Sequence, residues 1–173
     1  MTDKKEKILY SALELFANGG FNATSTNKIA KKAGVSEGLI FKHFKNKKGL
    51  LEAIMDSAEQ QITILFTPIL IETQANLVIK KTIELPFSIK KTQYNFWKLQ
   101  FKLKWEDEYN IPQKMQPLIE KLTWAFTELN YKTPKLEAQL LSQILDAIST
   151  EILKGNLDNH VELEGFLKVK YKV

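Results

Sequence analysis

The chain has 173 residues, 44% of them hydrophobic, and a net charge of +5, so it can bury a core and is not disordered throughout. It contains no Cys and two His, which excludes disulfide frameworks, thiolate nucleophiles, Cys-ligated zinc and a three-His site, and we expect no cofactor and no metal. The charged N-terminus and the lack of an apolar run of about 20 residues predict a cytoplasmic protein without a membrane partner.

Two amphipathic helices are expected at the start of the chain. Residues 3–18 carry apolar side chains at three- and four-residue steps, and Gly19-Gly20 ends that helix. Any of Thr24, Ser25 and Thr26 can cap the second helix, which Gly34 ends.

A brief third helix is predicted over 37–44, with Ser36 as its N-cap. Asn46 is expected to cap a fourth helix, which Pro68 kinks or ends.

Beyond this proline the chain is predicted to stay helical. Residues 101–105 alternate as a strand would, but the longer aromatic stripe from Tyr94 to Trp105 favours a helix. The expected helical segments are 69–85 (one helix or two), Pro86 toward Tyr109, 112–129, 134–154, and a last one from about Asp158.

The spacing between the second and third helices is that of a helix-turn-helix, in which the second helix of the pair enters the DNA major groove. Ala30 is small where the helices cross, and Gly34 takes a conformation that a Cβ resists. An unrelated helical hairpin can match this spacing, so the flanking sequence matters.

The positive charge lies in the first third of the chain. Residues 1–50 hold ten Lys and four acidic residues, a net of +6, whereas residues 51–173 carry a net of −1. Such asymmetry indicates a polyanionic partner for the basic part. There is no Arg, so every cationic contact must come from Lys.

The run GFNATSTNKIAKKAGVSEGLIFKHFKNKKGLL, residues 20–51, closely resembles the DNA-binding domain of the TetR (tetracycline-repressor) family. The resemblance implies an all-α protein with an N-terminal three-helix helix-turn-helix DNA-binding domain, residues 1–47, and a C-terminal helical ligand-binding and dimerisation domain, residues 48–173. It also implies a homodimer that binds a palindromic double-stranded DNA operator and is released from it by a small-molecule effector. Members of the family are mostly repressors, so a repressor is expected.

The same resemblance makes residues 36–44 the recognition helix. The residues expected to contact DNA are Ser25, Thr26, Ser36, Glu37, Gly38, Phe41, Lys42, His43 and Lys47. Lys47 is expected at a phosphate, with a solvated surface lysine as the alternative, and Glu37 is either a base-reading residue or a surface acid that complements the helix dipole. His43 is a phosphate donor or a packing residue. Phe41 stands where the family usually has Tyr, so one hydroxyl–phosphate contact is lost, while the ring can still make apolar contact with a thymine methyl.

Two further sets of residues are predicted in the C-terminal part. Aromatic side chains are expected to line an apolar effector pocket, although aromatics at helical spacing are usually core; these are Phe87, Trp97, Phe101, Trp105 and Trp124. The last two helices are more apolar than a surface helix requires, which favours a two-fold interface over packing within one chain; its expected residues are Leu140, Leu141, Ile144, Ile148 and Phe166.

Two other classes of function have less support in the sequence. No Ser/His/Asp or metal-ligand cluster supports an enzyme, since Glu106, Asp107 and Glu108 have the pattern of a solvated acidic turn. A helical interaction module whose helix-turn-helix no longer binds DNA is the alternative, and Glu37 and Phe41 are the residues that favour it.

Overall fold

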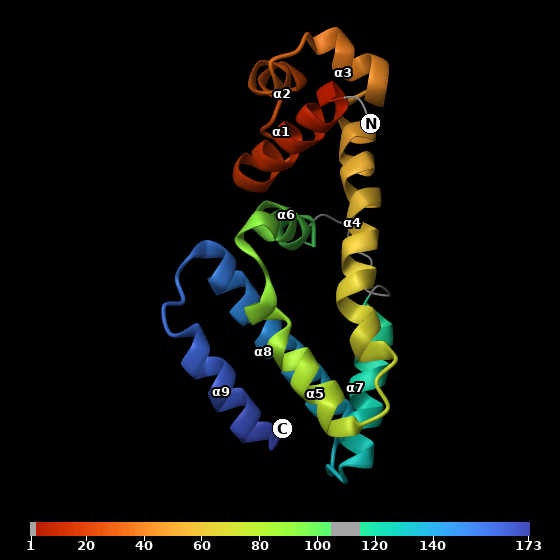
Figure 1. Ribbon diagram of the computed structural model, residues 1–173, viewed down its shortest axis with the longest axis vertical. Helices are drawn as coiled ribbons and strands as arrows, with labels where there is room; N and C mark the ends of the chain where they lie inside the picture. Colours follow the sequence, from red (N-terminus) through yellow and green to blue (C-terminus); the bar gives the residue numbers. More distant parts are fainter. Residues whose placement is uncertain (1–2, 105–114) are drawn as a thin grey trace. The chain divides into compact units, whose positions relative to one another are not determined.

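The computed structural model describes residues 3–104 and 115–173, except for the side chains of residues 58–61, and this part of the chain is helical without strands (Figure 1). The predicted all-α fold is confirmed. The chain forms two compact units: the first unit contains residues 1–62 and 92–110, and the second unit contains residues 63–91 and 111–173. The DNA-binding domain predicted over residues 1–47 lies within the first unit, and its boundary with residues 48–173 stays a prediction.

The first unit is built from the N-terminal helices and one helix from later in the chain. It contains α1 (Asp3–Gly19), α2 (Thr26–Ala33), α3 (Glu37–Phe44), the first part of α4 (Lys47–Leu70) and α6 (Tyr94–Leu103). Helix α1 packs against both α2 and α6. Side chains from all five helices share one core; its largest fully buried members are Ile8, Phe16, Ile29, Ile40, Leu50, Leu51 and Leu99.

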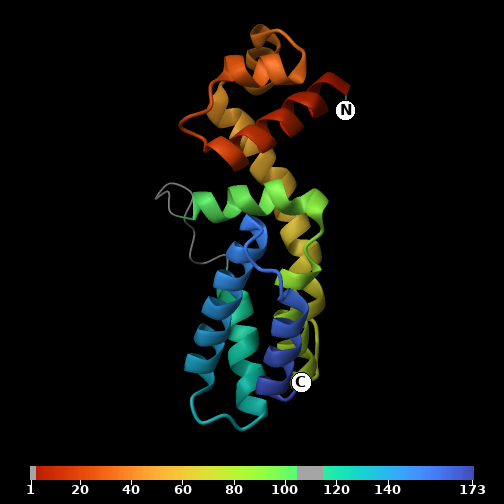
Figure 2. The ribbon, with the colours of Figure 1, turned by 90° about the vertical axis from the view of Figure 1, so that its left-hand side faces the viewer.

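The second unit is a helical bundle. It contains the end of α4, then α5 (Ala75–Glu84), the short 3-10 helix η1 (Pro86–Ser88), α7 (Gln116–Glu128), α8 (Pro134–Lys154) and α9 (His160–Tyr171). Helices α7 and α8 lie side by side, and α5 contacts both α7 and α9 (Figures 1 and 2). The largest fully buried side chains here are Phe126, Ile69, Ile79, Ile83 and Leu122.

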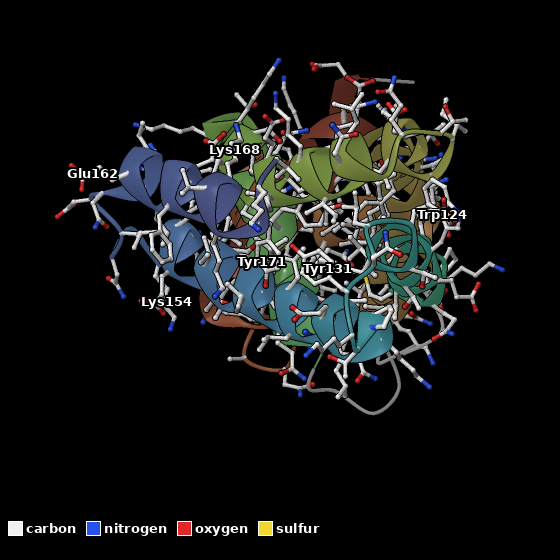
Figure 3. All side chains as sticks on the ribbon, turned by 90° about the horizontal axis from the view of Figure 1, so that it is seen from below. Trp124, Tyr131, Lys154, Glu162, Lys168 and Tyr171 are labelled. Carbon is white, nitrogen blue, oxygen red and sulfur yellow. The ribbon has the colours of Figure 1, made fainter. Side chains whose placement is uncertain are left out.

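Ion pairs and aromatic contacts hold the C-terminal helix α9 in the second unit. Lys168 Nζ lies 2.6 Å from a carboxylate oxygen of Glu84 on α5 and 2.7 Å from one of Glu164 on α9 itself. Hydrogen bonds to Glu164 and then Glu84 raise the pKa of Lys168. Near the end of α9, Tyr171 is buried beside Tyr131, whose hydroxyl is 3.5 Å from the Tyr171 carbonyl oxygen (Figure 3).

Two predicted elements differ from the structure. Pro86 opens only the single turn η1, because Ile89 is extended (φ −66°, ψ 117°) and breaks the expected helix toward Tyr109; α6 begins later, at Tyr94. The segment predicted to be helical over 69–85 differs at its start, because α4 runs past Pro68 to Leu70 and the next helix, α5, begins only at Ala75. The helical alternative for the alternating segment is confirmed as far as Leu103, where α6 ends.

Candidate nucleic-acid interface

Local sequence fixes the start and end of α2. Ser25 is the N-cap, and its Oγ accepts a hydrogen bond of 3.2 Å from the backbone N–H of Lys28. Gly34 ends the helix in the left-handed region (φ +66°), where glycine avoids the penalty that a Cβ brings. The N–H of Val35 then donates to the carbonyl of Ala30, 3.1 Å away, which closes the turn into α3. The predicted helix-turn-helix is therefore formed.

Helix α3 has one buried face and one exposed face. Ile40 and Phe44 are buried in the core of the first unit. Gly38, Phe41, Lys42 and His43 are all exposed, with Phe41 at 46%. A Cβ at Gly38 would meet no atom within 4 Å, so packing does not require glycine there. An exposed aromatic ring beside a lysine suits contact with base edges and phosphates.

Ser36 occupies the N-cap position of α3, but its side chain makes no capping hydrogen bond, and the residue is exposed. It lines an open groove of about 420 Å³ together with Lys4 of α1 and Lys31 of α2. Two lysines and a hydroxyl beside a helix N-terminus make this groove electrostatically favourable for an anion. Lys4 was not predicted as a site residue, because nothing in the local sequence shows that α1 begins beside this turn.

The carboxylate of Glu37 has a hydrogen-bond partner within the first unit. The hydroxyl of Thr26 donates to Glu37 Oε1 over 2.5 Å, and both residues are half-buried. This bond joins the first turn of α2 to the first turn of α3. The structure thus gives Glu37 a partner inside the protein, while its contact with a base edge stays a prediction.

Lys47, the first residue of α4, is not a solvated surface lysine. Its Nζ donates to the backbone carbonyls of Phe21, at 2.9 Å, and Thr24, at 3.1 Å. The ammonium also lies 4.4 Å from the centroid of the Phe21 ring, within cation–π range. The side chain therefore ties α4 to the loop that precedes α2.

The corner between α3 and α4 is tight. Lys45 has φ +64°, which is uncommon for a residue with a Cβ. Asn46 accepts the backbone N–H of Gly49 on its Oδ1 at 2.8 Å, as predicted for the cap of α4. A Cβ on Gly49 would overlap the carbonyl oxygen of Phe44. Glycine is thus required by a close approach of two backbones.

The residues predicted for an effector pocket are divided between the two units. Phe87 and Trp124 pack, half-buried, against the core of the second unit. Trp97 and Phe101 are half-buried on α6 in the first unit, and Trp97 packs edge-on against Phe96, with ring centroids 5.0 Å apart. Trp105 and the acidic residues 106–108 lie outside the described residues.

The residues predicted for a dimer interface also differ among themselves. Leu140 and Phe166 are exposed at 48% and 62%, whereas Ile144 is half-buried. Leu141 and Ile148 are buried in the core of the second unit, so their side chains are not available to a partner in this structure. Three further apolar residues on the same two helices are exposed in the structure and were not among the predicted interface residues: Leu136, Val161 and Val169.

Within the part of the chain that the structure describes, no three or more His, Asp and Glu side chains are grouped as a metal ion would need. In the same part, no helix is both long and apolar enough to cross a bilayer.

The fold and this site define an all-helical protein with a helix-turn-helix. Residues 8–54 match the family model of bacterial regulatory proteins, tetR family. The regulator TtgW of Pseudomonas putida is 30% identical over 94 residues, which are 54% of this chain and 70% of TtgW. The chain belongs to the tetR family of bacterial regulatory proteins.

Other relatives match over shorter stretches. The regulator YvkB of Bacillus subtilis is 47% identical over 55 residues, 32% of this chain and 29% of YvkB. The matches cover less than half the length of these relatives: 29% of YvkB, 18% of the regulator YerO of Bacillus subtilis and 44% of the regulator SrpR of Pseudomonas putida.

Solved structures share the fold over nearly the whole chain. A TetR-like transcriptional regulator from Rhodococcus sp. RHA1 superposes with a TM-score of 0.81 at 17% identity, over 95% of this chain and 92% of that one. The regulator FadR of Bacillus subtilis, solved in complex with stearoyl-CoA, has a TM-score of 0.67 at 21% identity, over 96% of each chain.

Proposed function

We propose that this protein is a dimeric transcriptional regulator that binds duplex DNA through α3 and is released when a small molecule binds its C-terminal part. The observation that carries the proposal is the exposed face of α3, where Phe41, Lys42 and His43 stand free of the core that holds Ile40 and Phe44. Family membership makes a promoter region the natural partner, and repression is the regulatory mode that we propose.

Phosphate contacts would come from the residues around this helix. Ser25 and Thr26 at the start of α2, and Ser36 at the start of α3, combine hydroxyls with helix N-termini, which favour anions. Because the chain has no Arg, these contacts depend on lysine point charges, and affinity should fall steeply with salt. The groove lined by Lys4, Lys31 and Ser36 adds to the same positive surface.

Dimerisation is proposed through α8 and α9. Leu136, Leu140, Val161, Phe166 and Val169 are exposed on these two helices. Exposed apolar side chains on these two consecutive helices favour burial against a second copy, because in two-fold pairing the same surface serves both partners. Replacing Leu140 with Glu should yield monomers in analytical ultracentrifugation, with the exposed polar Gln139 changed to Glu as the matched control. A Leu140→Glu protein that remains dimeric would contradict this interface.

The effector is proposed to be apolar, bound in the second unit near Phe87 and Trp124. Both side chains are half-buried against its core and could line a pocket that opens around a ligand. FadR, which shares the fold, was solved with stearoyl-CoA, and a long-chain acyl compound is therefore one class to test.

The proposal is tested by selecting binding sites from random duplexes with the full chain. An enriched palindrome is the expected result. If no sequence is enriched even at low salt, DNA binding is contradicted and an interaction module whose helix-turn-helix no longer binds DNA is favoured. Lys42→Ala should weaken binding to the selected site by about tenfold or more, whereas Lys132→Ala on the second unit removes the same charge with little effect. Equal losses of affinity in the two variants would show that α3 does not bind the duplex.

A further inference from the structure

We propose that Lys47 is a positioning residue, which shapes the loop over residues 20–25 so that the first turn of α2 can meet a DNA phosphate. The inference rests on the proposed function. It differs from the expected role of Lys47 as a phosphate contact, because the ammonium is already directed at two carbonyls of the protein.

The loop is held locally by the buried Thr24, whose N–H donates to the Phe21 carbonyl and whose hydroxyl lies 3.3 Å from the Leu15 carbonyl oxygen, and Lys47 adds the link from this loop to α4. Gly20 has φ +85°, and the Thr24 hydroxyl donates to the Gly20 carbonyl at 2.8 Å, so the loop closes on itself at its two ends. Between these ends, the Phe21 ring packs edge-on against Phe16, with centroids 5.2 Å apart. The Lys47 ammonium lies at the point where this ring and the carbonyls of Phe21 and Thr24 converge.

This placement links three elements of the first unit. Lys47 begins α4, Phe21 follows α1, and Thr24 immediately precedes the Ser25 cap of α2. Hydrogen bonds from a charged donor are stronger than neutral ones, and a half-buried ammonium is screened less than an exposed one. Without this donor the Phe21 carbonyl keeps only the N–H of Thr24, the Thr24 carbonyl loses its bond to α4, and the orientation of the first turn of α2 is less constrained.

The consequence for DNA binding follows from the order of residues. Ser25 and Thr26 come directly after Thr24, so the orientation of their hydroxyls and of the first amides of α2 depends on the loop. Carbonyl oxygens accept from an ammonium without neutralising its charge, so Lys47 also keeps the start of α2 positive. A positioning residue and a local positive potential are thus combined in one side chain.

The test compares Lys47→Met with Lys28→Met in the full chain. Each variant loses one charge and keeps a long unbranched side chain, and Lys28 is exposed on α2. Amide hydrogen exchange of the DNA-free protein is expected to rise about tenfold or more at residues 21–26 in Lys47→Met and to stay unchanged in Lys28→Met. This measurement needs no DNA, so its outcome is separate from that of the proposed function.

The second measurement is the salt dependence of binding to the selected site. Each variant loses one positive charge of the first unit and neither lysine is assigned a phosphate contact, so the slopes of the two variants should agree to within about one. Only Lys47→Met should also lower the affinity extrapolated to 1 M salt, by about tenfold to a hundredfold, because displaced hydroxyls and amides no longer bond a phosphate. Lys47→Arg, which keeps charge and donors, should recover part of this loss.

Lys47→Met and Lys28→Met proteins that agree in both loop exchange and the 1 M affinity would overturn the proposal and leave Lys47 as a simple phosphate charge. If Lys47→Met loses its helical circular dichroism, the same comparison is made between Lys47→Gln and Lys28→Gln. The shorter, uncharged carboxamide that Lys47→Gln introduces is a weaker donor than the ammonium, so increased exchange at the loop is still expected, and unchanged exchange would still refute the role.

Discussion

Replacing Gly49 with Ala should destabilise the protein, although local sequence predicts the reverse. Gly49 lies inside the first turn of α4 with an ordinary helical backbone, where Ala is favoured over Gly by about 1 kcal/mol. Its new Cβ, however, would overlap the Phe44 carbonyl oxygen, which belongs to the backbone and cannot rotate away. Overpacking of this kind costs about 1–3 kcal/mol, and loss of the Asn46 cap adds about 1 kcal/mol. The net loss in the free energy of unfolding is therefore about 1–3 kcal/mol.

The matched control is Gly38→Ala. Gly38 is also helical and in the same unit, but a Cβ there meets nothing within 4 Å. This change should stabilise by about 0.5–1 kcal/mol. Thermal unfolding followed by circular dichroism measures both, with an expected fall of roughly 2–12 °C for Gly49→Ala. A Gly49→Ala protein as stable as Gly38→Ala would refute the argument from close approach.

Two further changes test the second unit. Tyr171 is buried and its hydroxyl has no hydrogen-bond partner among the described residues. Tyr171→Phe should therefore raise the free energy of unfolding by about 1 kcal/mol in urea titrations, whereas Tyr131→Phe should not. A Tyr171→Phe protein that is less stable than wild type would contradict this. A hydrogen bond from Lys81, followed by one from the N–H of Gln74, lowers the pKa of Glu72 to about 2. Its contribution to stability is therefore complete above pH 4.5 and is lost as the pH falls toward about 2, so the stability difference between wild type and Glu72→Gln should shrink over that range. A difference that stays constant from about pH 6 to about pH 3 would refute the linkage.

Several helix ends were predictable because the signals that set them are local. Ser25 was one of the expected caps of α2, and Gly34 was expected to end that helix, because capping depends on a few neighbouring residues. Helix α8 matches the predicted range 134–154, which begins with a cap followed by proline and ends at glycine. The expectation for Pro86 was wrong, since a proline that suits a first turn says nothing about whether the following residues continue the helix.

Side-chain partners were not predictable in the same way. Lys47 and Glu37 each could face solvent, DNA or the protein, and the choice depends on carbonyls and a hydroxyl brought near by the tertiary fold. The same holds for the aromatic residues, because their helical spacing in the sequence does not predict that Trp97 and Trp124 belong to different units. Leu141 and Leu140 are neighbours in sequence, yet one is core and the other is exposed.

Helix α6 has a practical consequence for anyone who wishes to excise the DNA-binding part. The family match ends at residue 54, but Leu99 and Leu103 of α6 lie in the same core as Ile8, and Lys102 donates to the Asn18 carbonyl at the end of α1. A fragment cut at the end of the match would leave apolar surface on α1 in contact with water and invite aggregation. A minimal soluble fragment therefore has to carry α6, by a linker or by co-expression, even though it lies some forty residues farther along the chain.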